Sequence, residues 1–295
     1  DEKYGLGGSE LPFDGPTQEE IIGKFLDEGK IGKVMSIEAA EHVGYYHYAH
    51  SYTRGNWHKE ADSSPMILAK CSHDMDLIYW LAGENCTKLT SFGTQTYYNK
   101  KNAPANSAER CADCPVEGCV FRAQDFYLPR VPKWPTNVIH PEPTIENITE
   151  LLNTSDYGRC VYKMDNDVVD HQVTIMQFAN GKTACHTMTA FSKEIYRDLK
   201  IYGTKAELVG VIENNAFEVR YFGGEVEKIT IDVSAANVGG HMGGDYFMMN
   251  SLYKALNGEV AEGITYLDVS IESHLMSFAA EESRINGGKS CRLEK

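Results

Sequence analysis

The segment LAKCSHDMDL carries two basic side chains, Lys70 and His73, inside an apolar stretch. The pattern of residues 67–83 predicts a helix of about four turns that ends at Gly83. Residues three apart lie on adjacent turns, so the ammonium and the imidazole would be neighbours. Burial and mutual repulsion would favour the neutral form of at least one of them, which could then accept the proton of a substrate hydroxyl. The structural alternatives are a lysine that reaches the surface and a histidine satisfied in the core.

Residues 42–58 are crowded with tyrosine, histidine and tryptophan. Flat rings and many hydrogen-bonding groups suit a polyhydroxylated ligand, so Tyr48, Arg54 and Trp57 are candidate substrate-binding residues. The alternative is a tyrosine-rich sheet edge or an oligomer surface, because interfaces also favour Tyr and Trp. The histidines of this segment do not have the spacing of a recognised metal site.

Three cysteines follow a C-x2-C-x4-C pattern at Cys111, Cys114 and Cys119. This spacing predicts a structural zinc ion, although tetrahedral zinc needs a fourth ligand that the local sequence does not supply. Cys86 or Cys71 could serve from elsewhere in the fold. The alternative is a set of reduced thiols that hold a proline-rich loop by packing.

The composition indicates which kinds of partner the protein can bind and in which compartment it functions. The 295 residues include 42 acidic and 28 basic side chains, giving a formal charge of -14, which disfavours nucleic acid and anionic membranes as partners. No run of eighteen apolar residues is present, and the first residues do not resemble a signal peptide. Eight cysteines are too few for a disulfide scaffold. We therefore expect a cytoplasmic protein with no membrane span.

The sequence also predicts the helices and strands that must position the candidate site residues. A loosely held arm, residues 1–17, precedes a helix that starts at a capping box of Thr17 and Glu20. A strand follows at 33–43, and a Cys- and Pro-rich excursion occupies 104–143. Beyond it, alternating patterns predict short strands, and two helices close the chain at 245–258 and 265–288. The predicted strands are 159–166, 170–180, 182–192, 196–203, 206–212, 216–223 and 226–233.

These elements predict an α+β fold, in which helices pack on one face of a large, mostly antiparallel or mixed sheet. We expect an arm and connecting helix at 1–31, and one substrate-binding and oligomerisation domain at 32–295 that includes the excursion. The other sheet face needs cover, which predicts a homo-oligomer. The only early glycine cluster, GLGGSE, does not follow a strand, so no Rossmann domain is expected in this chain.

The order of several motifs resembles one known family. They are RGNWHKE, KCSHDMDLIYWLAG, RCADCPVEGC, YGRCVYKMDNDVVDHQ, IYGTKAEL, GGHMGGDYF and IESHLMSFAAEESR. Residues 20–295 resemble the C-terminal substrate-binding domain of the Gfo/Idh/MocA oxidoreductases. The resemblance implies hydride transfer between NAD or NADP and a hydroxyl group of a sugar, cyclitol or related compound. It also implies that the nucleotide is bound mainly by a domain not in this chain, so the chain alone should be inactive.

The resemblance also implies roles for single residues. His73 and Asp76 fall on the His and Asp that face the nicotinamide and the substrate in the family, and Lys70 falls on a lysine found in one subgroup. The more common Asp, four residues before the histidine, is Ala69 here. The segments MDNDVVDHQ and GGHMGGD are similar to family segments near the substrate, which adds candidate substrate-binding residues. These are Asp167, His171 and His241. For each of them, a polar loop residue or helix cap is the alternative.

Two other functions remain open at this stage. Some members of the family are NAD-dependent glycosidases, which oxidise a sugar transiently to allow elimination. The chain could instead be a binding or oligomerisation module that performs no catalysis.

Overall fold

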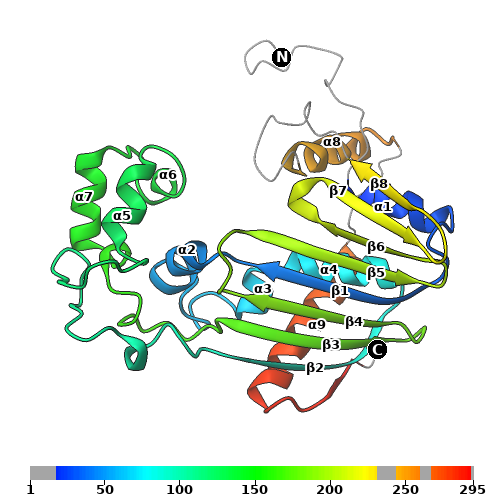
Figure 1. Cartoon of the computed structure of the whole chain (residues 1–295), viewed down its shortest axis with the longest axis horizontal. Coiled ribbons are helices and arrows are strands. Elements are labelled where there is room, and N and C mark those ends of the chain that lie inside the picture. Colours follow the sequence, from blue (N-terminus) through cyan, green and yellow to red (C-terminus); the bar gives the residue numbers. More distant parts are fainter. Residues whose placement is uncertain (1–17, 231–243, 260–266, 294–295) are drawn as a thin grey trace, which may run out of the picture. The chain divides into compact units, whose positions relative to one another are not determined.

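The computed structural model describes residues 18–230, 244–259 and 267–293 (Figure 1). The described residues divide into two compact units, one drawn from 1–38 and 197–270 and the other from 39–196 and 271–295. Strand β1 (Val34–His42) contributes residues to both. The expected capping residue Thr17 lies outside the described residues.

The first unit contains a meander of antiparallel hairpins. Its strands are β5 (Tyr196–Gly203), β6 (Ala206–Val211), β7 (Ala216–Tyr221) and β8 (Val226–Thr230), and each pairs antiparallel with the next. Helices α1 (Gln18–Asp27) and α8 (Gly244–Leu256) belong to the same unit. The alternating patterns in these segments therefore form strands as predicted.

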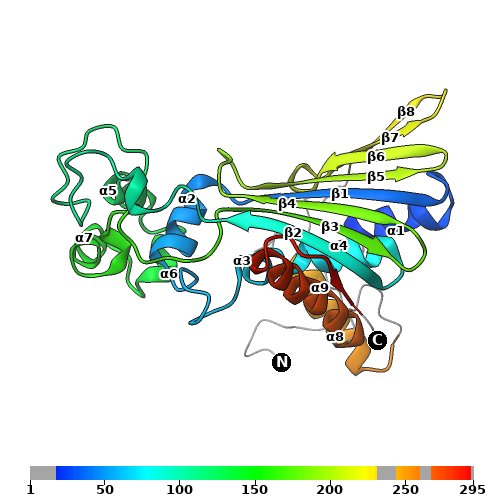
Figure 2. The same ribbon diagram turned by 90° about the horizontal axis from the view of Figure 1, so that it is seen from below.

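The second unit contains the strands β2 (Cys86–Thr94), β3 (His171–Phe178), β4 (Thr183–Thr189) and the short β9 (Cys291–Arg292). Along β3, every second side chain from Gln172 to Phe178 is buried, whereas Val173 and Ile175 are exposed. Figure 2 shows α4 (Ser72–Ala82) and α9 (Leu267–Ile285) on one face of these strands. The Ser283 hydroxyl on α9 accepts a hydrogen bond from the Ser91 amide on β2 at 2.9 Å. One sheet face is thus covered by helices, and the other carries apolar side chains that are exposed.

Among the described residues, nine strands hydrogen-bond in the order β8-β7-β6-β5-β1-β4-β3-β2-β9. The predicted α+β fold with a large mixed sheet is therefore confirmed. One predicted strand is absent from the described residues, and one strand of the structure was missed. Residues 159–166 form turns rather than a strand, apart from a single bridge between Arg110 and Arg159, and strand β2 was not predicted.

The predicted helix at 67–83 is in fact two helices, α3 (Met66–Ala69) and α4. The chain leaves helical geometry at Lys70 and Cys71, and helix α4 then ends at Gly83 in the left-handed conformation, as predicted. No proline or glycine causes the interruption. The break instead coincides with tertiary contacts of its two residues, since Lys70 pairs with Glu41 and Cys71 is fully buried.

The aromatic segment folds into helices rather than a sheet edge. Helix α2 (Tyr45–His47) continues directly into the π-helix η2 (Tyr48–Arg54). The wider turn of a π-helix shifts the faces on which successive side chains lie, and such turns are frequent at functional sites. Here it buries most of its residues, including Tyr48, His50 and Arg54.

The Cys- and Pro-rich excursion and the helix after it have a small core of their own. This core consists of Cys111, Ala123, Tyr127, Ile148 and Leu152. The helices that contribute to this region are α5 (Ala123–Tyr127), α6 (Thr136–Ile139) and α7 (Ile145–Thr154). Single 3-10 turns occur at η3 (Lys100–Asn102), η4 (Leu128–Arg130), η5 (Asp156–Gly158) and η6 (Ile212–Asn214).

Within the described part of the chain, every helix is too short or too polar to cross a lipid bilayer.

Candidate active site

Lys70 forms an ion pair inside the second unit. Its Nζ lies 3.1 Å from Oε1 of Glu41, whose carboxylate is completely buried near the end of β1, and the lysine side chain is only 14% exposed. Charged groups are costly to bury unless they are paired. The break between α3 and α4 thus places an ammonium group against a buried carboxylate.

His47 lies beside this ion pair. The pKa of His47 is lowered to about 3, first by burial and then by the positive charges of Lys70 and His50. Its ring packs edge-on against the indole of Trp134, with 5.4 Å between the ring centroids. His47 is therefore a neutral imidazole at physiological pH, and it connects the ion pair to an aromatic surface.

That surface is one wall of an open cavity of about 290 Å³. Three aromatic residues and three charged residues line it: Tyr45, Tyr46, Trp134, Arg130, Lys193 and Glu194. Aromatic faces stack on the C–H faces of sugar rings, and the charged groups can hold hydroxyl or carboxylate groups. The cavity has the composition expected of a site for a polar, ring-shaped ligand.

His73 and Asp76 occupy the first turns of α4. The side chain of His73 is exposed, and that of Asp76 is half-buried, with a buried Oδ1 that has no hydrogen-bond partner among the described residues. Lys70 and His73 therefore do not share a buried pocket, and that expectation was wrong. The neighbours of Lys70 are Glu41 on β1 and His47 in α2, rather than a residue three positions along its own helix.

The three candidates from the aromatic segment lie in different environments. Tyr48 is fully buried, and its hydroxyl donates to the carbonyl oxygen of Val168 at 3.0 Å. Arg54 is also buried, and its guanidinium donates to the carbonyl oxygens of Arg159 and Phe121. Only Trp57, which is 44% exposed, presents its ring to solvent. Of these three candidates, none lines the cavity, whereas Tyr45 and Tyr46 from the same segment do.

Asp167 and His171 flank the start of β3. Asp167 is exposed, and its Oδ1 accepts a hydrogen bond from the Glu60 amide at 2.8 Å. The Nδ1 atom of His171 lies 2.7 Å from Oδ1 of the completely buried Asp170. A carboxylate on one ring nitrogen orients an imidazole and leaves the other nitrogen for a ligand. His241 lies outside the described residues.

The three cysteines of the predicted zinc site line one small cavity together with a fourth, Cys160. The Arg54 guanidinium donates to the Sγ of Cys111 at 3.4 Å. Neither Cys86 nor Cys71 lines this cavity. Among the described residues, the four thiols are not a group whose ligand atoms lie within 4.8 Å of one another, so this structure gives the zinc prediction no support.

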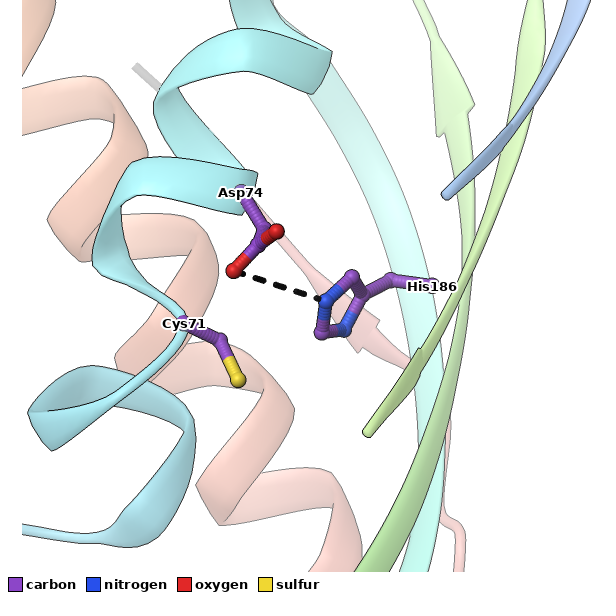
Figure 3. Close-up of side chains that lie close together, drawn as sticks. All are labelled: Cys71, Asp74 and His186. Carbon is purple, nitrogen blue, oxygen red and sulfur yellow. Dashed lines mark ion pairs between the residues drawn. The ribbon is translucent and has the colours of Figure 1, made fainter. Parts of the chain in front are cut away.

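A different set does meet that distance: Cys71, Asp74 and His186 (Figure 3). The first two come from the start of α4 and the third from β4. All three are buried.

Several residues of the site were missed by the sequence analysis. Glu41 could have been found, because it continues the inward alternation of Ile37 and Ala39 and so places a carboxylate on the buried side of a strand. Asp170 belongs to the segment MDNDVVDHQ, which the sequence analysis expected near the substrate, but its contact with the His171 ring was not predicted. Trp134 gave no signal, because only the packing of a proline-rich segment brings it to His47.

Comparison with known proteins identifies the family. Residues 24–269 match the model of the oxidoreductase family, C-terminal alpha/beta domain, of the Gfo/Idh/MocA group. The YteT protein of Bacillus subtilis (strain 168), which carries an oxidoreductase name, is 27% identical over 257 residues, covering 81% of this chain and 57% of that protein.

Solved structures share the fold at low sequence identity. Levoglucosan dehydrogenase in complex with NADH and L-sorbose has a TM-score of 0.60 and 14% identity, covering 92% of this chain and 61% of that chain. A super-repressor mutant of Gal80p from Saccharomyces cerevisiae has a TM-score of 0.53 and 12% identity, covering 91% and 60%. The chain thus spans about 60% of the length of the proteins it matches.

Proposed function

Because the chain belongs to the Gfo/Idh/MocA oxidoreductase family through its C-terminal alpha/beta domain, we propose that it supplies the substrate-recognition part of an NAD(P)-dependent dehydrogenase. The substrate is a sugar, cyclitol or related acid with a free hydroxyl group. In the oxidation, the carbon gives up a hydride to the nicotinamide, the hydroxyl gives up a proton to a base, and a carbonyl group forms. The nucleotide is held mainly by residues beyond this chain.

The ion pair of Lys70 and Glu41 carries this proposal. A hydroxyl that is being oxidised needs a proton acceptor, and the reverse reaction needs a proton donor at the same place. Lys70 can pass its proton to the Glu41 carboxylate, 3.1 Å away, and then take the proton of the substrate. His73 and Asp76, on the next turns of the same segment, would orient the reacting hydroxyl.

The cavity beside His47 supports a carbohydrate-like substrate. Tyr45, Tyr46 and Trp134 offer rings for stacking, while Arg130 and Lys193 offer hydrogen-bond donors. His171, held by Asp170, and the exposed Trp57 and Asp167 would contribute further contacts. The levoglucosan dehydrogenase structures contain NADH with levoglucosan or L-sorbose, which agrees with a nicotinamide cofactor and a sugar.

The test uses the full-length enzyme under saturating substrate. Lys70→Met should lower kcat about a hundredfold or more, because a positioned acid/base group is lost. Glu41→Gln should lower kcat and change its pH profile, whereas Lys101→Met, which removes an exposed lysine, should change neither. Wild-type rates and pH profiles in the Lys70 variant would move the acid/base chemistry to another residue.

Two alternatives have specific support. The family's NAD-dependent glycosidases use the same hydride step, and incubation with an aryl glycoside would release the aglycone only in that case. Gal80p, whose super-repressor mutant has a solved structure, shares the fold, so a module without catalysis is also consistent with the architecture. Absence of turnover by the full-length protein with a panel of sugars and both nucleotides would favour that module.

The proposal also includes the oligomeric state of the protein and its cellular compartment. We place a homo-oligomer contact on the open face of β2, β3 and β4, where Phe92 and Ile175 are more than half exposed. Burying such side chains between copies would remove apolar surface from water. The cysteines form no disulfide in the described residues, which agrees with a reducing compartment such as the cytoplasm.

A further inference from the structure

Three side chains with different donor atoms meet in the interior between α4 and β4. Cys71 occupies the N-cap position of α4, Asp74 lies in the first turn, and His186 projects from the covered face of β4 toward them (Figure 3). One ligand atom from each lies within 4.8 Å of the other two. None of the three side chains is more than 2% exposed. They are separated by up to 115 residues in the sequence, so packing alone brings them together.

The spacing of these atoms fits the ligands of a single ion. Oδ2 of Asp74 and Nε2 of His186 are 3.9 Å apart, which is longer than a hydrogen bond. Around a tetrahedral ion with bonds of about 2.0 to 2.3 Å, neighbouring ligand atoms are separated by roughly 3.3 to 3.8 Å. Because all three ligand atoms lie within 4.8 Å of one another, a contraction of at most about 1.5 Å would bring the set to bonding distance.

The chemistry of the donors selects the ion. A thiolate, a carboxylate and an imidazole are the three ligand types that Zn²⁺ accepts, whereas Ca²⁺ and Mg²⁺ prefer oxygen alone. The thiolate and the carboxylate together carry two negative charges, which a divalent ion neutralises.

We propose that Cys71, Asp74 and His186 form a structural Zn²⁺ site that fixes the break between α3 and α4. Binding releases the thiol proton, and a water molecule enclosed with the ion takes the fourth position. The ion links the first turn of α4 to strand β4. The link is made at the part of the chain that carries Lys70 and His73. The site thereby holds Lys70 against Glu41, and this proposal does not depend on the dehydrogenase activity.

The first test is the metal content of the purified chain. Mass spectrometry of the metals should find about one zinc per chain in the wild-type protein. Cys71→Ser and His186→Gln should each lose most of it. Cys86→Ser, which alters a buried thiol elsewhere, and Cys114→Ser, in the four-cysteine cavity, should retain it. Wild-type protein without zinc, or full zinc in Cys71→Ser, would overturn the proposal.

A spectroscopic test covers the case in which the variants fail to fold. Wild-type protein reconstituted with Co²⁺ should show a thiolate-to-cobalt charge-transfer band with the intensity of a single Co–S bond, and d–d bands of a four-coordinate ion. A band several times stronger would assign the metal to the four-cysteine cavity and overturn the proposal. Crystals of the protein should give an anomalous peak at the zinc edge between α4 and β4.

Discussion

At the scale of single residues, the ion pair of Lys70 and Glu41 is proposed to act in catalysis, and it also affects the stability of the fold. Glu41 is completely buried, and Lys70 nearly so. Removal of one partner from a buried pair typically destabilises a protein by about 3 to 5 kcal/mol, because the other charge is left without compensation. A loss of activity in Lys70→Met should therefore be accompanied by a stability measurement, so that lost catalysis can be distinguished from unfolding.

His47 and His50 should make the protein sensitive to acid. Burial lowers the pKa of His47 to about 3, helped by Lys70, and lowers the pKa of His50 to about 4, helped by Arg54. In the unfolded chain both have pKa values near 6.5, so the unfolded state binds more protons below that pH. The free energy of unfolding should be intact above pH 6.5 and fall by about 1.4 kcal/mol per pH unit for each histidine as pH decreases toward 4.

Urea unfolding of the wild-type chain at a series of pH values measures this slope. His47→Gln should remove one histidine's share of it, and His50→Gln the other. An unchanged slope in both variants would show that these imidazoles do not control the acid stability.

At the scale of elements, the short helical segments η5 and α7 pack with their backbones very close together. Gly158, at the end of η5, lies so near the C-terminal part of α7 that a Cβ atom there would be 1.6 Å from the carbonyl oxygen of Leu152. Backbone atoms cannot give way as a flexible side chain can. The glycine is therefore required by contact rather than by its φ angle.

Gly158→Ala should destabilise the protein by about 2 to 4 kcal/mol, since η5 and α7 must separate to admit the methyl group. Thermal unfolding measures the effect. Glu150→Ala, on the exposed side of the same helix, should change the stability by no more than about 0.5 kcal/mol. Equal melting temperatures for wild type and Gly158→Ala would contradict the close approach.

At the scale of the whole molecule, the open sheet face carries exposed apolar side chains that a partner could cover. Phe92 and Val173 lie opposite one another on β2 and β3, and Ile175 follows on the same face. Their side chains are 57%, 37% and 54% exposed. Large exposed apolar patches on soluble proteins usually mark interaction sites.

Ile175→Lys should convert the oligomer to monomers, because a charge placed in an apolar contact would have to be desolvated. Light scattering after size-exclusion chromatography measures the mass. Val138→Lys, an equivalent change on the exposed side of α6, should leave the assembly intact. A wild-type protein that is monomeric at high concentration would refute the proposed interface.

The proposed position of the nucleotide can be tested on the chain itself. The sequence predicts no strand, glycine-rich loop and helix of the kind that binds a pyrophosphate. Calorimetry should therefore detect only very weak binding of NADH or NADPH to residues 1–295. Micromolar affinity would show that the chain carries a nucleotide site that the sequence analysis missed.

The sequence by itself determined the fold class, the terminal helices and most strands. Strand β3 is readable because its side chains alternate between the covered and open faces, and the end of α4 because Gly83 permits the left-handed conformation. The family could also be named from the order of its motifs, and the match over residues 24–269 agrees. Each of these features depends on neighbours within one element, which a single sequence records directly.

The tertiary structure alone decided where the charged and metal-binding side chains meet. The break at Lys70 has no local signal, and neither do the pairing with Glu41, the entry of Cys160 into the cysteine cavity, or the approach of His186 to Asp74. These contacts join residues far apart in the chain. The energy of each contact depends on how deeply the side chain is buried and on which partner another element supplies. Both are determined only when the helices pack on the sheet.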